Sequence, residues 1–118
     1  MNVCPKVSVT IVTYNHGNML AECLDSILSQ VTPFSVEILV GEDASTDQIS
    51  RKIAQKYFDL YPQRIRLFQR SVNVGACGNY FSIVQESQGE YIAHIDGDDK
   101  MLPGKLALQQ NFSTSTKM

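Results

Sequence analysis

The strongest constraint on the fold is the alternation of two kinds of apolar pattern along the chain. Short runs rich in β-branched residues are each followed by a longer segment in which apolar residues recur at helical spacing. The expected strands are residues 7–13, 36–41, 65–68 and 91–95. A strand–helix order without linkers is typical of a parallel sheet with right-handed crossovers. We therefore predict an α/β fold, a Rossmann-like, mostly parallel sheet of about four strands with flanking helices.

Local signals set the ends of the expected helices. Asn18 is positioned to cap the first helix, and Ser45 with Gln48 three residues later resembles a capping box for the second. Pro62 closes the second helix, and Gly89 is the expected C-cap of the third. Helical spacing also predicts the inward-facing residues, and these are Ile49, Ile53, Tyr57 and Leu60 in the second helix and Phe81 and Val84 in the third.

Bulk properties exclude several classes of protein. A chain of 118 residues fits one domain, and its net charge of −2 offers no basic surplus for a nucleic acid. No apolar run approaches the roughly 18 residues of a membrane span, and the N-terminus lacks the core of a secretion signal. Three widely spaced cysteines argue against a disulfide framework or zinc site, and Cys23 is expected on a buried helix face. These features predict a cytoplasmic protein with reduced thiols.

Polar residues follow three of the expected strands directly. Parallel sheets bind ligands beyond the carboxyl ends of their strands, near a topological switch point. The rule selects Tyr14 and Asn15 after the first strand, Glu42 and Asp43 after the second, and residues 96–99 after the fourth. All three places carry groups that can meet one ligand, and this convergence is stronger evidence than any single motif.

The last of these places holds Asp96, Asp98 and Asp99 within four positions. Mg²⁺ and Mn²⁺ prefer oxygen ligands, and Mg²⁺ takes one or two carboxylates and leaves the rest to water and substrate phosphates. Gly97 allows a tight turn, so that neighbouring side chains can face one pocket. The segment predicts a divalent cation that carries a nucleotide diphosphate. The competing interpretation is an exposed acidic turn that caps the next helix.

The other two places predict contacts to the nucleoside. Asp43 can accept hydrogen bonds from a nucleobase or a ribose hydroxyl, and Tyr14 can stack on a base. The alternatives are helix capping for Asp43 and plain turn chemistry for Tyr14. Capping is the favoured interpretation for Ser45 and Asp47.

The remaining polar residues of these loops favour structural roles. Asn15 suits a tight turn. Asn73 and Gly75 are expected to shape a loop, and the alternative is a contact to the nucleotide or the sugar. His16 is expected to be an exposed loop residue. His94 lies inside a strand and is expected to be a satisfied core or interface residue.

Four motifs together resemble the start of the family 2 glycosyltransferases, which have the GT-A fold. The resemblance runs from about residue 7 to residue 109 and is carried by "VSVTIVTYNHGNMLAECLDSILSQ", "EILVGEDASTD", "NVGACGNYFSIVQESQGEYIAHIDGDD" and "MLPGKLALQ". It implies transfer of a sugar from a nucleotide donor, often a UDP-sugar, with inversion at the anomeric carbon. Where the family usually has Asp-Asp before Ala-Ser-Thr-Asp, this chain has Glu42-Asp43.

The resemblance also implies roles for individual residues. Tyr14 would line the base pocket and Asp43 would contact the base. Asp96 or Asp98 would lie near the ribose and sugar, and Asp98 or Asp99 would meet Mg²⁺ or Mn²⁺.

An inverting transfer needs a general base, and the chain has no Asp, Glu or His after Asp99. We therefore expect no catalytic base in these residues, a nucleotide-sugar-binding domain at 1–109 and a polar, disordered tail at 110–118. The acceptor-binding half would be absent, so transfer by these 118 residues alone should be slight. The acceptor would be a glycan or a lipid-linked molecule, as in polysaccharide synthesis, in the cytoplasm or at the inner face of the membrane. An open sheet edge would favour self-association.

Two other functions compete with this interpretation. One is a non-catalytic nucleotide-binding or interaction module. The other is a receiver domain with an acidic phosphorylation pocket. Such a domain requires paired acidic residues after the first strand, and this chain has "TYNH" there.

Overall fold

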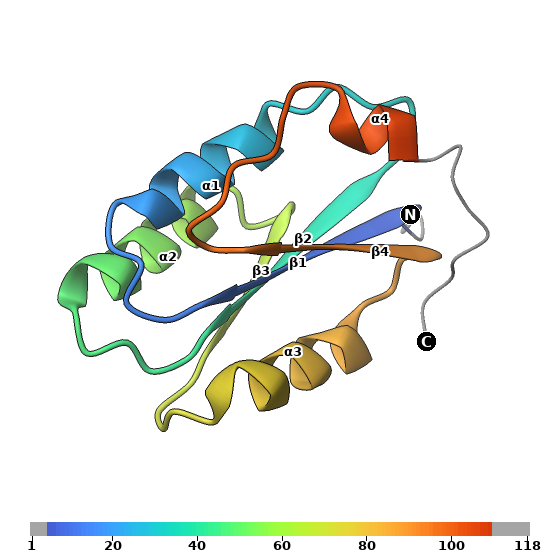
Figure 1. The fold of residues 1–118 in the computed structure, drawn as a ribbon. Helices are drawn as coiled ribbons and strands as arrows, with labels where there is room; N and C mark the ends of the chain where they lie inside the picture. Colours follow the sequence, from blue (N-terminus) through green and yellow to red (C-terminus); the bar gives the residue numbers. More distant parts are fainter. Residues whose placement is uncertain (1–4, 110–118) are drawn as a thin grey trace.

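The structure, a computed structural model, describes residues 5–109 and confirms the predicted α/β fold. Four parallel strands form one sheet in the order β3-β2-β1-β4 (Figure 1). In chain order the elements are β1 (Val7–Thr13), α1 (Met19–Leu28), β2 (Val36–Glu42), α2 (Gln48–Leu60), β3 (Ile65–Gln69), α3 (Gly75–Glu86), β4 (Tyr91–Asp96) and α4 (Lys105–Gln109). The tail predicted for 110–118 lies outside the described residues.

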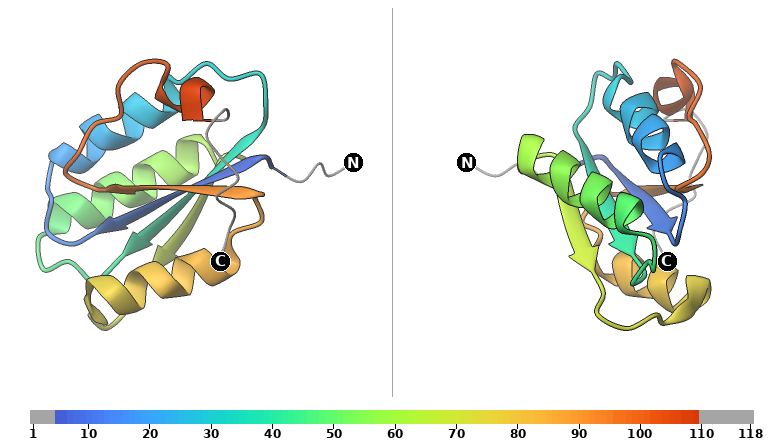
Figure 2. Two further views of the ribbon diagram at one scale, coloured as in Figure 1. Left: turned by 45° about the vertical axis from the view of Figure 1, so that its right-hand side comes forward. Right: turned by 90° about the vertical axis from the view of Figure 1, so that its left-hand side faces the viewer.

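The helices form a layer on each face of the sheet. Figures 1 and 2 show α1 and α2 on one face, with α4 beside α1, and α3 alone on the opposite face. This arrangement follows from the strand order. The chain moves outward from β1 to β3 and then returns to β4, so right-handed crossovers place the returning helix on the other side. The reversal makes the carboxyl ends of β1 and β4 a topological switch point.

The main core lies between the sheet and the pair α1 and α2. All seven residues of β1 are buried, because this central strand has helices on both faces. Cys23 lies on the buried face of α1 as predicted and has no exposed surface, whereas Met19, which shares the apolar spacing of this helix, is 47% exposed. Met101 and Leu106 join the same core from the segment after β4. That segment is tied to α1 by hydrogen bonds from Met101 N to Ser26 Oγ and from Leu106 N to Gln30 Oε1.

The face under α3 has a smaller core, formed by Val12, Leu39 and Ile83. Helix α3 contacts β1 and β2, so only a narrow stripe of it is buried. The prediction that Phe81 faces inward is therefore wrong, because its side chain is 59% exposed, whereas Val84 is buried as predicted.

Helix α2 also buries less than its pattern predicts. Ile49 and Leu60 are at least half exposed, and Ile53 and Tyr57 pack only partly against the core. The prediction that Ile49 and Leu60 face inward is therefore wrong.

Two of the predicted caps differ from the structure, and a third lacks its side-chain hydrogen bond. Asn18 occupies the N-cap of α1 but makes no capping hydrogen bond. Asp47, not Ser45, caps α2 by accepting a hydrogen bond from Ser50 N at 2.6 Å. The C-cap of α3 is Ser87 rather than Gly89. Gly89 lies instead against β1, in a contact too close for a side chain.

Within residues 5–109, no helix has the length and apolar character needed to cross a bilayer. Strand β4 pairs only with β1 among the described strands, which leaves its outer edge open. The self-association expected from such an edge stays a prediction.

Candidate functional site

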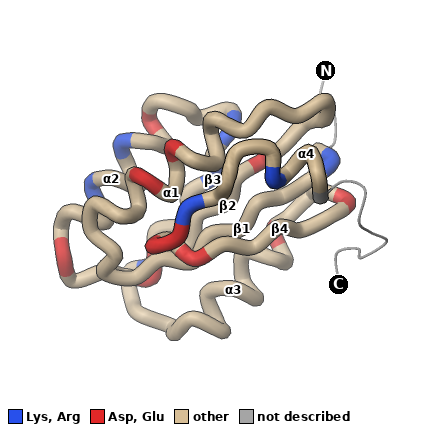
Figure 3. Tube along the Cα trace, turned by 45° about the horizontal axis from the view of Figure 1, so that its top comes forward, with Lys and Arg blue, Asp and Glu red and all other residues tan. Residues whose placement is uncertain are grey.

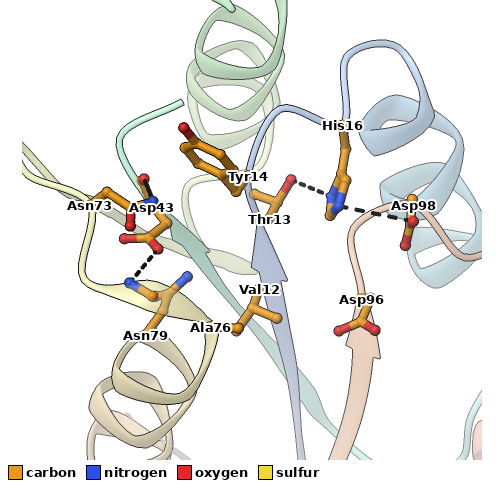
Figure 4. A pocket seen from close by; sticks show the side chains of 11 residues that line it. Val12, Thr13, Tyr14, His16, Asp43, Asn73, Ala76, Asn79, Asp96 and Asp98 are labelled. Atoms are coloured by element: carbon orange, nitrogen blue, oxygen red, sulfur yellow. Dashed lines mark hydrogen bonds and ion pairs between the residues drawn. The ribbon is translucent and has the colours of Figure 1, made fainter. Parts of the chain in front are cut away.

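A pocket of about 420 Å³ lies where the carboxyl ends of β1, β2 and β4 meet. Figure 4 shows side chains from these three strand ends and from the start of α3 turned toward it. The structure therefore brings together four residues that the sequence singled out: Tyr14, Asp43, Asp96 and Asp98. The other lining residues are Val12, Thr13, His16, Asn73, Gly75, Ala76 and Asn79. The volume falls in the range of small-molecule sites.

Asp43 is fixed at the back of the pocket and is only 3% exposed. Its two carboxylate oxygens accept hydrogen bonds from the backbone N–H groups of Val74 and Gly75, at 2.8 and 2.9 Å. Asn73 donates its side-chain amide to the Asp43 carbonyl at 3.0 Å. Asp43 thus anchors the loop before α3, a role that the sequence did not predict. Each carboxylate oxygen keeps a further lone pair for a donor from the pocket.

The neighbouring Glu42 has a purely structural environment. It has no exposed surface, and its carboxylate accepts hydrogen bonds from the hydroxyl and the backbone N–H of Ser45. Ser45 therefore serves Glu42 rather than capping α2. Of the two neighbouring acidic residues, Asp43 lines the pocket and Glu42 does not.

Tyr14 stands at the mouth of the pocket, with its side chain 42% exposed and free to offer a ring face. Asn15 has a left-handed backbone (φ 57°), as expected for a tight turn. Its side-chain oxygen accepts hydrogen bonds from Thr46 N and Asp47 N, and its amide donates to Thr46 Oγ1. The loop after β1 is thereby joined to the loop after β2.

Asn79 is a site residue that the sequence analysis missed. It is buried on α3, where its amide donates to the Gly41 carbonyl and its oxygen accepts two hydrogen bonds from Arg70. A side chain on Gly41 would collide with Asn79. A polar residue on the inner face of a helical pattern was the only available signal, and its partners come from distant segments.

The three acidic residues after β4 form a compact turn. The backbone N–H of Asp99 donates to the Asp96 carbonyl at 3.0 Å, and one carboxylate oxygen from each of Asp96, Asp98 and Asp99 lies within 4.8 Å of the others. All three residues are exposed. Lys100 turns away to pair with Glu22 at 3.0 Å. Figure 3 shows acidic residues gathered where β4 ends.

Asp96 and Asp98 line the main pocket, whereas Asp99 lines a second cavity of about 290 Å³. Asp96 borders both cavities, and Lys100 and Lys105 border the second. The acidic turn therefore lies between the main pocket and the second cavity, and each of them is lined by two of its three aspartates.

Gly97 is required for packing rather than for a special backbone angle. A Cβ atom there would lie 2.6 Å from Thr13 Oγ1 and 2.7 Å from His16 Nδ1. The expectation that His16 is a plain exposed loop residue is wrong. Its Nδ1 lies 2.9 Å from Thr13 Oγ1, and its Nε2 lies 4.0 Å from Asp98 Oδ2 inside the pocket (Figure 4).

The chemistry of Cys23 gives a prediction that is independent of any ligand. Burial, with a smaller contribution from the negative charges of the acidic turn, raises the pKa of this thiol from 9.0 to about 12. Each pKa unit is a factor of ten, so the thiolate fraction at pH 8 falls about a thousandfold below that of an unshifted thiol. We expect iodoacetamide to label the exposed Cys77 readily and Cys23 hardly at all.

Peptide mass spectrometry of the quenched reaction measures this difference. In concentrated guanidinium the two cysteines should react at similar rates, because both the burial and the nearby charges are lost. Equal labelling in the native protein would contradict the buried position of Cys23.

Comparison with known proteins identifies the family. The model of the family described as "Glycosyl transferase family 2" matches residues 8–115, which is most of the chain. This chain belongs to glycosyl transferase family 2. The resemblance seen in the sequence motifs is thereby confirmed.

Individual members of glycosyl transferase family 2 and its fold neighbours are similar over nearly the whole chain. "Putative glycosyltransferase EpsE" of Bacillus subtilis is 40% identical over 95% of this chain. The crystal structure of S. aureus TarS 1-349 in complex with UDP-GlcNAc has 28% identity and a TM-score of 0.72 over 86% of this chain. The mannosyltransferase PcManGT of Pyrobaculum calidifontis, in complex with GDP-Man and Mn²⁺, has a TM-score of 0.76 over 90% of this chain, and its 23% identity supports the shared fold.

This family 2 chain spans a minor part of those proteins. It covers 40% of EpsE, 29% of the TarS chain and 31% of the PcManGT chain. The family and these structural similarities thus account for the fold of the chain.

Proposed function

We propose that this chain is the donor-binding part of a glycosyltransferase and that its pocket binds a nucleotide diphosphate sugar, a UDP-sugar in the first instance. The observation that carries the proposal is the meeting of Tyr14, Asp43, Asp96 and Asp98 in one pocket at the switch point of the sheet. The TarS structures, 28–29% identical to this chain, contain UDP-GlcNAc and UDP, which supports a uridine nucleotide.

The pocket walls suit the parts of such a ligand. The exposed ring of Tyr14 offers a stacking surface for a base, and Asp43 offers a fixed acceptor for a base N–H. At the other end of the pocket, Asp96 and Asp98 can accept hydrogen bonds from ribose or sugar hydroxyls. This distribution supports a nucleoside over β1 and β2 and a diphosphate toward the end of β4.

The acidic turn fits a divalent cation. Its donors are all carboxylate oxygens, within 4.8 Å of one another, and oxygen is the ligand that Mg²⁺ and Mn²⁺ prefer. Asp98 and Asp99 would hold the ion, and their exposure leaves room for water and phosphate ligands. When bound, such an ion stabilises the charge that develops on a departing nucleoside diphosphate.

The described residues supply binding and orientation rather than proton removal. For inverting transfer, an acceptor hydroxyl attacks the anomeric carbon, the bond to the diphosphate breaks, and a base takes the hydroxyl proton. The pocket carboxylates are engaged by the loop before α3 or grouped in the acidic turn. We propose that the base and the binding site for the glycan or lipid-linked acceptor lie in other parts of a longer protein.

Titration of the 118-residue chain with UDP and Mn²⁺ by calorimetry tests the proposed function directly. Binding that depends on the uridine and is strengthened by Mn²⁺ supports it, with UMP and GDP as ligand controls. Absence of UDP binding by folded protein, with or without Mn²⁺, would contradict it.

Asp43→Asn is expected to weaken uridine and UMP by roughly tenfold, with or without metal. The amide keeps the size of the side chain, but it replaces an acceptor oxygen with a donor that faces Val74 N–H or Gly75 N–H. Calorimetry with UMP and with UDP in EDTA measures the loss, and thermal melting reports any loss of stability. An affinity change confined to UDP with metal would remove Asp43 from the base pocket.

A further inference from the structure

His94 bridges a buried residue of the sheet and the first carboxylate of the acidic turn. Its Nδ1 lies 2.9 Å from Thr10 Oγ1, and its Nε2 lies 3.2 Å from Asp96 Oδ1. Thr10 has no exposed surface, whereas the side chain of His94 is 33% exposed and that of Asp96 56%. The histidine therefore connects a buried residue of the sheet, Thr10, to an exposed side chain of the site, Asp96.

The sheet register explains why these three residues meet. Thr10 pairs with His94, and Val12 pairs with Asp96, in the parallel ladder of β1 and β4. Residues two apart on a strand share a face, so His94 and Asp96 both stand on the face that α3 partly covers. The ring of Tyr80 on α3 meets the imidazole edge-to-face at a centroid distance of 4.8 Å. The imidazole is thus held by a hydrogen bond and a ring contact.

The hydrogen-bonding capacities settle which ring nitrogen faces the acid as a donor. An ionised carboxylate only accepts hydrogen bonds, so the contact at 3.2 Å requires a hydrogen on Nε2. The Thr10 hydroxyl can complete the pattern from the other side by donating to Nδ1. One oxygen of Asp96 is then occupied by His94, and the other stays available to the pocket.

Asp96 needs such a restraint because of its neighbours. Its carboxylate lies within 4.8 Å of those of Asp98 and Asp99, and like charges at this range repel. An exposed aspartate relieves repulsion by rotating toward solvent. Lys100, the nearest lysine in sequence, forms its ion pair with Glu22 rather than with a carboxylate of the acidic turn.

We propose that His94 is a positioning residue that holds Asp96 in its ligand-binding orientation, an inference that rests on the proposed nucleotide-sugar function. Thr10 shares this positioning role, because its hydroxyl holds the imidazole of His94, and the imidazole in turn holds the carboxylate of Asp96. His16 repeats the pattern with Thr13 and Asp98 at a longer distance, 4.0 Å, so the direct hydrogen bond belongs to His94.

Three substitutions at position 94 separate positioning from packing. His94→Ala removes both contacts, His94→Asn keeps a polar group near the place of Nδ1, and His94→Gln keeps an N–H donor near the place of Nε2. Calorimetry with UDP and Mn²⁺ should show a loss of roughly tenfold for Ala and Asn, the usual effect of removing a supporting hydrogen bond, and recovery for Gln. Thermal melting identifies any variant that has lost its fold.

The control is the same measurement in an Asp96→Ala background, which has no acceptor for His94 Nε2–H. Asp96→Ala should itself weaken binding, and adding His94→Ala should then cost nothing more, because the histidine acts through that carboxylate. Long-range ¹H–¹⁵N NMR of the ligand-free protein adds an independent readout, and should show the hydrogen of His94 on Nε2.

The outcomes distinguish this inference from the proposed function. If the unmodified chain does not bind UDP, the proposed function fails and the inference fails with it. If the unmodified chain binds UDP, the inference alone is overturned by any of three results: unchanged affinity in Asp96→Ala or His94→Ala, equal losses in Gln and Asn, or a bare Nε2 in the NMR spectrum.

Discussion

Replacing Asp99 with asparagine should lower the affinity of the chain for UDP in the presence of Mn²⁺ by about 100-fold, or about 2.7 kcal/mol. The substitution keeps the shape of the side chain but removes one of three negative charges that face one another within 4.8 Å. A hard cation loses a charged oxygen ligand, while the sheet and the base pocket are untouched. Asp98→Asn should have an effect of the same size.

The measurement is calorimetry with UDP in Mn²⁺ and again in EDTA. With EDTA the variants and the unmodified chain should bind equally weakly, because the metal contribution is absent from all of them. Glu90→Gln is a matched control, since it removes one carboxylate charge from an exposed pair with Lys6 rather than from the acidic turn. Unchanged affinity in both Asp98→Asn and Asp99→Asn would show that the acidic turn holds no metal.

Gly89→Ala should destabilise the fold by about 2 kcal/mol or more, because the added methyl group has no room. A Cβ atom at position 89 would lie 2.6 Å from the backbone nitrogen of Ser8 and 2.8 Å from the carbonyl carbon of Val7. These are backbone atoms of the central strand, so they cannot swing aside as a side chain can. The hydrogen bond from Gly89 N to Ser8 Oγ, at 2.8 Å, would be strained as well.

Gly78→Ala is the matched substitution in open space. Position 78 lies inside α3, and a Cβ atom there would meet only the Val74 side chain at an ordinary 3.7 Å. Alanine is a better helix former than glycine, so this variant should be more stable by about 0.5–1 kcal/mol. Urea denaturation of both variants gives the comparison. Equal stabilities would contradict the close approach of residue 89 to β1.

The strands and helices could be predicted from the sequence because each of them depends on a local pattern of residues. Each strand was located to within one residue at either end, since the β-branched runs are short and bounded by polar or glycine-rich segments. The strand-end rule then selected Tyr14, Asp43 and the acidic turn as neighbours. The structure places these residues together because parallel strands carry their carboxyl ends to one edge.

Features that depend on distant partners were not predicted. Ser45 and Asp47 both suit a helix cap, and the choice fell to Asp47 because Ser45 is bound by Glu42 and by the backbone of Asn15. Phe81 follows the helical pattern yet faces solvent, because α3 packs mainly on β1 and β2 and buries only a narrow stripe.

Two polar site residues were missed for the same reason. His16 and Asn79 reach the pocket through contacts to Thr13 and Arg70, and nothing in the sequence near either residue indicates these partners.

The hydrogen bonds of the Asn15 side chain affect the rate of ligand association and the free-energy cost of ordering the backbone on binding. Its three hydrogen bonds to residues 46 and 47 make the two loops at the base pocket a single rigid unit before any ligand arrives. A nucleotide then meets a surface that is already shaped, and little of its binding energy is lost to immobilising backbone. Association at this end of the pocket should accordingly resemble the docking of two preformed surfaces, without a slow folding step.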